Sequence, residues 1–207
     1  HSNPQEWFGV HDVRLSQCEP VDVRGLPKEV DGRTAWAVPD WFPSTGRTDL
    51  PEFGILFLDE ANSAPQSVQA AAYQIANDRR IGDHKMKPGW SIVMAGNRMT
   101  DGGVVYKMPL PLCNRLMHLY AEVDFDEWRA WAFGNDIDFT VIAFLGFRPD
   151  LLNTFESFVK NKVEGHAFAT PRTWARLSSL KPIVANDNEL MLSAIGLVGE
   201  TTAAEYV

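Results

Sequence analysis

The stretch GILFLDEANSAPQSVQAAAYQI, residues 54–75, runs from a wholly apolar segment through two adjacent carboxylates into a helical pattern. The continuous apolar residues at 55–58 predict a buried strand that is covered on both faces. After Pro65, which suits a first helical turn, apolar side chains recur at helical spacing. That apolar face consists of Val68, Ala71, Ala72 and Ile75. A buried strand that leads into an amphipathic helix favours the α/β fold class.

Three more apolar runs extend this pattern. They are HDVRLSQ at 11–17, WSIVMAGN at 90–97 and LMHLYAEV at 116–123, and each predicts a strand. Residues 24–53 lie between the first two strands and are rich in Gly, Pro and Asp, which predicts a hairpin or an elaborated loop. The sequence up to residue 123 therefore predicts an α/β core with a mostly parallel sheet flanked by helices.

The pattern changes after residue 123. Apolar residues then recur at helical spacing, with Gly and Pro between the segments. The segments are VIAFLGF at 141–147, LLNTFESFV at 151–159, PRTWARLSSL at 171–180 and ELMLSAIGLVG at 189–199. We therefore predict two domains, an α/β core over 1–123 and a small helical subdomain over 124–207.

Composition excludes several classes of protein. Hydrophobic residues make up 45% of the chain and charged residues 22%, which is typical of a globular protein. No apolar run approaches the roughly 20 residues that span a bilayer, so no membrane association is expected. Two cysteines are too few for a disulfide framework, which favours a cytoplasmic location. The net charge of −8 disfavours nucleic acid as a partner.

The two carboxylates, Asp59 and Glu60, follow directly after the predicted buried strand. Parallel strands deliver such residues to the carboxyl edge of the sheet, where ligands bind in open α/β folds. Asn97 ends another continuous strand, so we expect it beside Asp59 at the same edge. Two simpler interpretations stay open: the carboxylates only lead the chain into solvent, or Asn97 only caps a turn.

On these residues the chain resembles the MoxR-like branch of the AAA+ ATPases, which are P-loop NTPases. The stretch 54–75 resembles the Walker B strand and its helix, and SIVMAGN resembles the sensor 1 strand that ends in Asn97. PLCNRLMHL resembles the arginine-finger segment with Arg115, and ATPRTW the sensor 2 helix with Arg172. DVRLSQCEPVDVRGLP and DRRIGDHKMKPGW resemble the second strand with its insert and the hairpin before sensor 1. The resemblance extends over nearly the whole chain.

The resemblance implies a role for each of these residues in ATP hydrolysis. Asp59 would hold the Mg²⁺ bound to ATP, and Glu60 would act as general base on the attacking water. Asn97 would orient that water and sense the γ-phosphate. Arg115, with Arg98 as the competing candidate, would reach the γ-phosphate of a neighbouring subunit. Arg172 would bring the helical lid onto the nucleotide.

Arg115 and Arg172 also have simpler interpretations, as a surface or salt-bridged arginine and as an exposed helix arginine. Lys85 and Lys87 lie in the hairpin that precedes sensor 1. They could contact a substrate in a central pore, but a solvated hairpin tip is the favoured interpretation.

The sequence departs from the family at one motif. G-x-x-x-x-G-K-[ST], which cradles the phosphates in a P-loop NTPase, occurs nowhere in the 207 residues. In the family it precedes the strand that HDVRLSQ resembles, so we expect this chain to be a fragment that lacks the Walker A segment. The absent strand would lie between the strand that ends at Asn97 and the one at 116–123.

Two functions follow from the resemblance and this departure. The first is an ATP-hydrolysing remodelling enzyme that forms a homo-oligomeric ring, expected to be a hexamer, and acts on protein partners. The resemblance implies a protein with a von Willebrand factor A domain as one such partner. The alternative is a nucleotide-incompetent module for assembly or partner binding.

Overall fold

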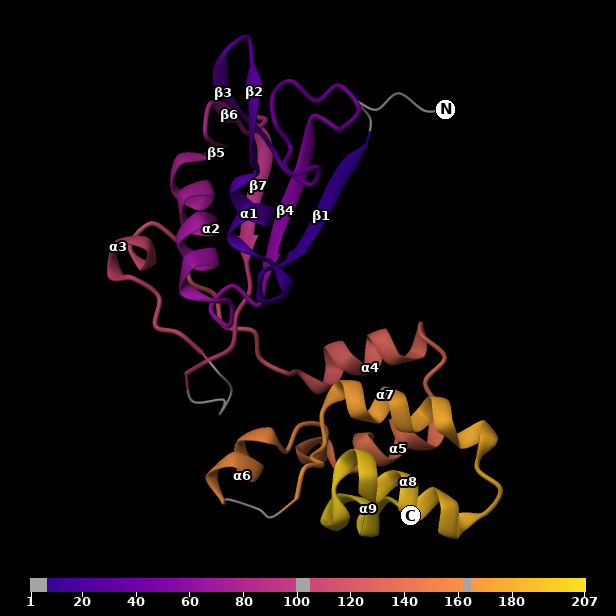
Figure 1. The fold of residues 1–207 in the computed structure, drawn as a ribbon. Coiled ribbons are helices and arrows are strands. Elements are labelled where there is room, and N and C mark those ends of the chain that lie inside the picture. Colours follow the sequence, from indigo (N-terminus) through magenta and orange to yellow (C-terminus); the bar gives the residue numbers. More distant parts are fainter. Residues whose placement is uncertain (1–6, 100–104, 162–164) are drawn as a thin grey trace. The chain divides into compact units, whose positions relative to one another are not determined.

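The computed structural model describes residues 7–99, 105–161 and 165–207. By its internal contacts the chain divides into two compact units, one ending at His118 and one beginning at Leu119 (Figure 1). The first is an α/β unit and the second consists of helices. The sequence places its boundary between core and lid slightly later, after residue 123.

A three-stranded parallel sheet forms the centre of the α/β unit. Its strands are β1 (Phe8–Arg14), β4 (Phe53–Asp59) and β7 (Gly89–Met94), in the order β1-β4-β7. The register places Arg14 opposite Asp59, and Leu58 opposite Met94. The strands predicted at 54–60 and 90–97 are confirmed as β4 and β7. The one predicted at 11–17 is shifted, because β1 ends at Arg14 and Leu15–Gln17 forms a 3-10 turn. The α/β fold class with a parallel sheet flanked by helices is confirmed as well.

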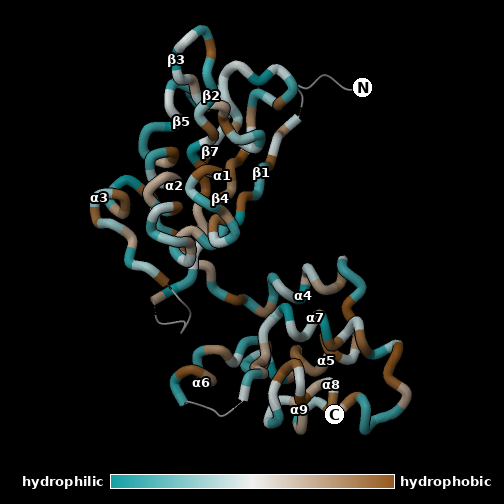
Figure 2. Tube along the Cα trace, in the orientation of Figure 1, coloured by the Kyte–Doolittle hydropathy of each residue, from teal (hydrophilic) through white to brown (hydrophobic). Residues whose placement is uncertain are grey.

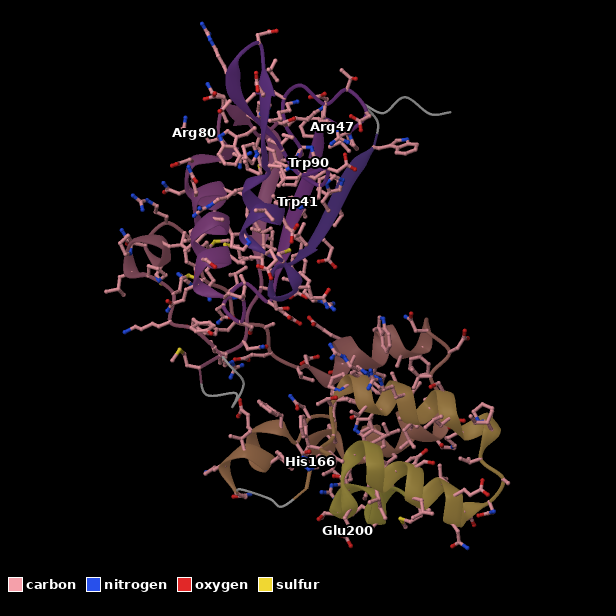
Figure 3. All side chains as sticks on the ribbon, in the orientation of Figure 1. Trp41, Arg47, Arg80, Trp90, His166 and Glu200 are labelled. Atoms are coloured by element: carbon pink, nitrogen blue, oxygen red, sulfur yellow. The ribbon has the colours of Figure 1, made fainter. Side chains whose placement is uncertain are left out.

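One face of this sheet is covered by the helices α1 (Pro20–Arg24) and α2 (Gln66–Asp78). Helix α2 begins directly after Pro65. All four residues of its predicted apolar face are buried, and they pack with Leu56 and Leu58 of β4. Trp90, which lies against the sheet in Figure 3, is 1% exposed. A Cβ on Gly9 or Gly54 would come within 2.8 Å of its ring, so these positions require glycine.

The opposite face of the sheet carries apolar side chains that stay exposed. Phe8 and Val10 of β1 are 62% and 63% exposed, and Phe53 of β4 is 58% exposed. No helix within residues 7–99 and 105–118 covers this face. The expectation that the buried strands are covered on both faces is therefore wrong for this part of the chain. We call the surface formed by Phe8, Val10, Phe53 and Val93 the open sheet face.

The strand expected at 116–123 is absent. After the short helix α3 (Leu110–Cys113) the chain continues without regular structure up to Asp124. Met117, Leu119 and Tyr120 are between 78% and 83% exposed. A strand needs a partner for its backbone groups, and within the described residues this segment pairs with none.

The predicted hairpin within residues 24–53 is confirmed. The strands β2 (Leu26–Val30) and β3 (Arg33–Ala37) pair antiparallel, and Asp31 and Gly32 form the turn with positive φ. Such backbone angles are typical of two-residue hairpin turns.

The hairpin that precedes β7 is also present, as β5 (Arg80–Ile81) and β6 (His84–Lys85). Lys85 is exposed, but Lys87 is buried, and its Nζ donates to Glu52 Oε1 at 2.8 Å and to the Leu50 carbonyl at 3.0 Å. Both earlier interpretations of Lys87, as part of a solvated hairpin tip and as a pore contact, are therefore wrong. Its ammonium group pairs with Glu52 and is not available to solvent or substrate. A buried ammonium group requires such a partner.

The second unit is helical throughout, as predicted. Its helices are α4 (Phe125–Phe133), α5 (Phe139–Phe147), α6 (Phe155–Lys160), α7 (Pro171–Leu180), α8 (Asp187–Val198) and α9 (Glu200–Tyr206). Short 3-10 turns occupy Pro149–Leu151 and Lys181–Ile183, and one more, Leu15–Gln17, belongs to the first unit. Trp174 and Leu145 are fully buried in the core of the helical unit. Figure 2 shows α5 as hydrophobic along most of its length, which agrees with the burial of Val141 and Leu145.

Polar side chains cap the N-termini of four of these helices. In each case a side chain accepts a backbone N–H from the first turn, which satisfies a donor that has no partner inside the helix. The capping residues are Asp124 for α4, Asp138 for α5, Thr170 for α7 and Asn186 for α8. Among the described residues, no helix is both long enough and apolar enough to span a bilayer.

Asp138 is the cap whose loss should cost most. Its Oδ1 accepts from Thr140 N at 2.9 Å and from Lys181 Nζ at 2.8 Å. We expect Asp138→Ala to lower the free energy of unfolding by about 1 kcal/mol, since the partly exposed ion pair adds little to the cap. Urea unfolding followed by circular dichroism measures this, with Glu122→Ala as the exposed control.

The same interaction gives a pH signature. Hydrogen bonding from Lys181 and Thr140 lowers the pKa of Asp138 from its ordinary value of 3.8 to about 2. Its contribution to stability is present above pH 4 and is lost as the pH falls toward 2. Equal stability of Asp138→Ala and the parent chain at neutral pH would contradict the assignment.

Candidate functional site

The predicted carboxylate pair lies at the carboxyl edge of the central strand. Asp59 is the last residue of β4, and Glu60 begins the turn that follows. Their side chains are 30% and 39% exposed. Glu60 has a φ of 52°, a left-handed conformation that costs a non-glycine residue about 1 kcal/mol or more. Its amide donates to Asp59 Oδ1 at 2.8 Å, which holds the two residues of the bend together.

Asn97 lies at the same edge, three residues after β7, and it is tied to this turn through Asn62. The Asn62 side chain donates to the Asn97 carbonyl at 2.7 Å and accepts from the Asn97 amide at 3.1 Å. A Cβ on Gly96 would come within 2.3 Å of Asn62 Oδ1, so the close approach of the two segments requires glycine there. The Asn97 side chain is left exposed beside the carboxylate turn.

A buried glutamine of α2 holds the loop that follows Glu60 through hydrogen bonds to its backbone. Gln69 of α2 is 3% exposed, and its Nε2 donates to the carbonyls of Ala64 at 2.8 Å and Asn62 at 3.3 Å. Tyr73 donates to Gln69 Oε1, and burial raises the pKa of the Tyr73 phenol, so it stays a neutral donor. The loop between β4 and α2 is therefore held by side chains from its own helix.

Two residues of this site were not found by sequence reasoning. Arg14 ends β1, and its Nε lies 3.9 Å from Asp59 Oδ2 and 3.8 Å from Glu60 Oε1. Ser16 donates its hydroxyl to Glu60 Oε2. The sequence position of Arg14 could have revealed it. Arg14 ends a strand that runs parallel to β4, and in the register of the two strands it lies opposite Asp59.

Asp59 is suited to the hard cation that the sequence predicted. Carboxylate oxygens are the ligands that Mg²⁺ prefers, and the Asp59 carboxylate is accessible at the sheet edge. The Asp59 carboxylate interacts with Arg14 and with the Glu60 amide. Its remaining lone pairs can accept hydrogen bonds from water that is bound to a metal ion. The residues present thus fit a Mg²⁺ ion that is held mainly by another ligand, such as a phosphate.

The predicted arginines come from three different parts of the chain. Arg115 is exposed in the turn after α3, where its guanidinium donates to the Pro111 carbonyl at 3.3 Å. No described contact joins it to Asp59 or Glu60. Arg98 directly follows Asn97 and is exposed. Arg172 lies in the first turn of α7, in the helical unit. The roles of these arginines stay predictions.

Comparison with solved structures includes a distant match. A solved structure of a "putative ATPase" from Cytophaga hutchinsonii matches 95% of this chain and 71% of its own, with 12% identity and a TM-score of 0.42. A similarity this low in both identity and TM-score supports no inference about activity. No protein-family model and no curated protein matches the chain.

Proposed function

We propose that this chain supplies the hydrolytic edge and the helical lid of an ATP-hydrolysing AAA+ remodelling protein of MoxR type. The observation that carries the proposal is the Asp59–Glu60 pair at the end of β4, beside the exposed Asn97 that follows the adjacent parallel strand. Two acidic groups and one amide at a sheet edge can separate three tasks, namely charge neutralisation, proton abstraction and water positioning.

Each side chain has one role in this proposal. Asp59 would accept hydrogen bonds from the water shell of a Mg²⁺ ion, and that ion would supply positive charge against the phosphates. Glu60 takes the proton from the attacking water, and the Asn97 amide orients that water. The Nε of Arg14 lies within 4 Å of both carboxylates and offsets part of their negative charge. Arg172 closes the lid on the nucleotide.

In this proposal another part of the protein supplies the phosphate-binding segment, since residues 1–207 contain no G-x-x-x-x-G-K-[ST]. Two features of the α/β unit would accommodate a further strand and helix that carry this segment. Strand β7 pairs only with β4 within the described residues, and the open sheet face lacks a covering helix there. Parallel sheets are almost always covered on both faces.

The ring, the von Willebrand factor A domain partner and the cytoplasmic location belong to the same proposal and rest on the sequence resemblance. The absent phosphate motif favours a second candidate, a nucleotide-incompetent module for assembly or partner binding. Mg²⁺-dependent phosphate release by the longest natural protein that contains this chain separates the two. Assembly or partner binding without nucleotide binding would favour the second.

The finger role of Arg115 has its own test in that protein. We expect Arg115→Ala and Glu60→Gln each to lower ATP turnover in homogeneous rings. Mixing the two variants should restore part of the activity, because an intact Arg115 would then face an intact Glu60 across some interfaces. If the mixed rings assemble but recover no activity, Arg115 is not a finger that acts in trans. The same experiment with Arg98→Ala tests the competing arginine.

A further inference from the structure

A groove of about 640 Å³ lies beside β1 in the α/β unit. Its walls come from β1, from α1 and from the base of the β2–β3 hairpin. Val13 is buried in the core, whereas Asp12 and Arg14 are exposed, and all three residues line the groove. Because successive side chains of a strand point to opposite faces, a groove that all three line must reach the edge of β1.

The edge of β1 that faces away from β4 has no strand partner within residues 7–99, 105–161 and 165–207, and Figure 1 shows β1 at the margin of the sheet. Alternate residues of a parallel strand direct their N–H and C=O groups to the same side, so part of the β1 backbone is available for pairing. Of these groups, the Arg14 carbonyl alone accepts a hydrogen bond from a described residue outside the sheet, from Cys18 Sγ at 3.5 Å. An extended peptide presents backbone groups at the same spacing, and such strand addition is a common mode of peptide recognition.

The wall of the groove on the α1 side is apolar. Its side chains are Val13, Val21, Leu26, Val38, Pro39 and Trp41. Val38 and Trp41 pack against the core, but Val21 and Leu26 are 50% and 59% exposed. An apolar side chain that entered the groove would remove this surface from water, which is favourable in proportion to the area covered.

The remaining charge of the groove is negative. The exposed residues Asp12 and Asp22 line it, and neither forms an ion pair within the described part of the chain. Arg14 also lines the groove, but its Nε already lies 3.9 Å from Asp59 Oδ2 and 3.8 Å from Glu60 Oε1. The groove is therefore electrostatically complementary to a cationic partner.

We propose that the β1 edge binds an extended peptide in which apolar and basic side chains alternate. The apolar side chains on one face of the added strand enter the groove beside α1, and the basic side chains on the other face reach Asp12. A second copy of this chain fits less well. In an antiparallel pair its β1 would place Gly9, His11 and Val13 on the apolar side, and of these only Val13 is aliphatic. The proposal goes beyond ATP hydrolysis and does not depend on it.

The test uses the full 207-residue chain and a fluorescein-labelled peptide of sequence KVKVKV. Fluorescence anisotropy measures the Kd, and amide hydrogen exchange followed by mass spectrometry locates the bound peptide. We expect saturable binding together with slower exchange in β1, because an added strand protects the amides that it pairs with. Asp12→Lys should raise the Kd about tenfold by reversing the charge, and Val21→Ser should raise it about threefold by removing apolar contact.

Asp83→Lys and Val30→Ser are the matched controls, since they make the same changes at exposed residues of this unit that do not line the groove. Both should leave the Kd unchanged, and near-ultraviolet circular dichroism confirms that each variant is folded. A second test leaves the protein unaltered and uses the two peptides that are N-methylated at alternate residues. One of them should bind about tenfold more weakly than KVKVKV, because its methyl groups block the amides that donate to β1.

The proposal is overturned if KVKVKV does not bind, if both N-methylated peptides bind as it does, or if Asp12→Lys and Val21→Ser bind it as the parent does. Protection from exchange in β7 and not in β1 would also overturn it, because the peptide would then occupy the other edge of the sheet. Equal affinity for EVEVEV would contradict the charge complementarity. If the chain alone forms a dimer that protects β1 in the same way, the occupant is a second copy and the peptide assignment fails.

Discussion

Replacing Glu60 with glutamine should lower the rate of ATP hydrolysis in the complete protein by about 10²-fold or more, while ATP binding persists. The amide has nearly the shape of the carboxylate but cannot take the proton from the attacking water. Glutamine also accepts a hydrogen bond from Ser16 through its carbonyl oxygen, so the contact to β1 can remain. The expected signature is a reduced kcat with little change in the Kd for ATP.

Steady-state phosphate release and equilibrium binding of a fluorescent ATP analogue measure the two quantities. Glu29→Gln is the matched control, because Glu29 lies on the exposed strand β2 and should leave both unchanged. Unchanged turnover in Glu60→Gln would remove Glu60 as general base. A parallel loss of binding and turnover would instead point to a structural role for this turn.

Replacing Trp90 with alanine should lower the stability of the α/β unit by about 3–5 kcal/mol. Its ring fills the space above Gly9 and Gly54, where no other side chain approaches as closely. Its Nε1 donates to the Pro51 carbonyl at 2.9 Å, so the substitution also removes a partly buried hydrogen bond. A loss of this size is a large fraction of the stability of a small domain.

Urea unfolding followed by near-ultraviolet circular dichroism measures the effect. Trp36→Ala provides the control, since Trp36 is 41% exposed and should cost much less. Equal losses in the two variants would contradict the packing described for Trp90. The helical unit has a separate core, so far-ultraviolet signal from its helices should persist after the Trp90→Ala unit has unfolded.

The sequence alone was sufficient to predict those strands and helices whose apolar residues form a continuous run or recur at helical spacing. The apolar runs that became β4 and β7, and the face of α2, carry their signal in adjacent residues. The run at 116–123 carries the same local signal but forms no strand, because a strand also depends on a neighbour that the sequence pattern does not reveal. Periodicity thus identifies a preference for extended structure, and pairing decides whether it is realised.

Long-range contacts explain what sequence reasoning missed at the candidate site. Asp59, Glu60 and Asn97 were found because each follows a recognisable strand. Arg14 and Ser16 contact the carboxylates from more than forty positions away, as the separation of 44 between Ser16 and Glu60 illustrates. Lys87 was misassigned for the same reason, since its partner Glu52 is 35 residues distant.

One edge of β7 has no pairing partner within residues 7–99, 105–161 and 165–207, which bears on how the isolated chain should behave in solution. Edge strands in soluble proteins usually carry lysine, proline or a bulge, which prevents edge-to-edge association. Residues 89–94, GWSIVM, contain no charge and no proline, and Val93 is 42% exposed. Two copies could therefore pair through this edge and extend the sheet. Strand β7, which leads to Asn97, is thus an edge at which the isolated chain is open to self-association, and a charged substitution at Ser91 or Val93 is the natural means of keeping that chain monomeric.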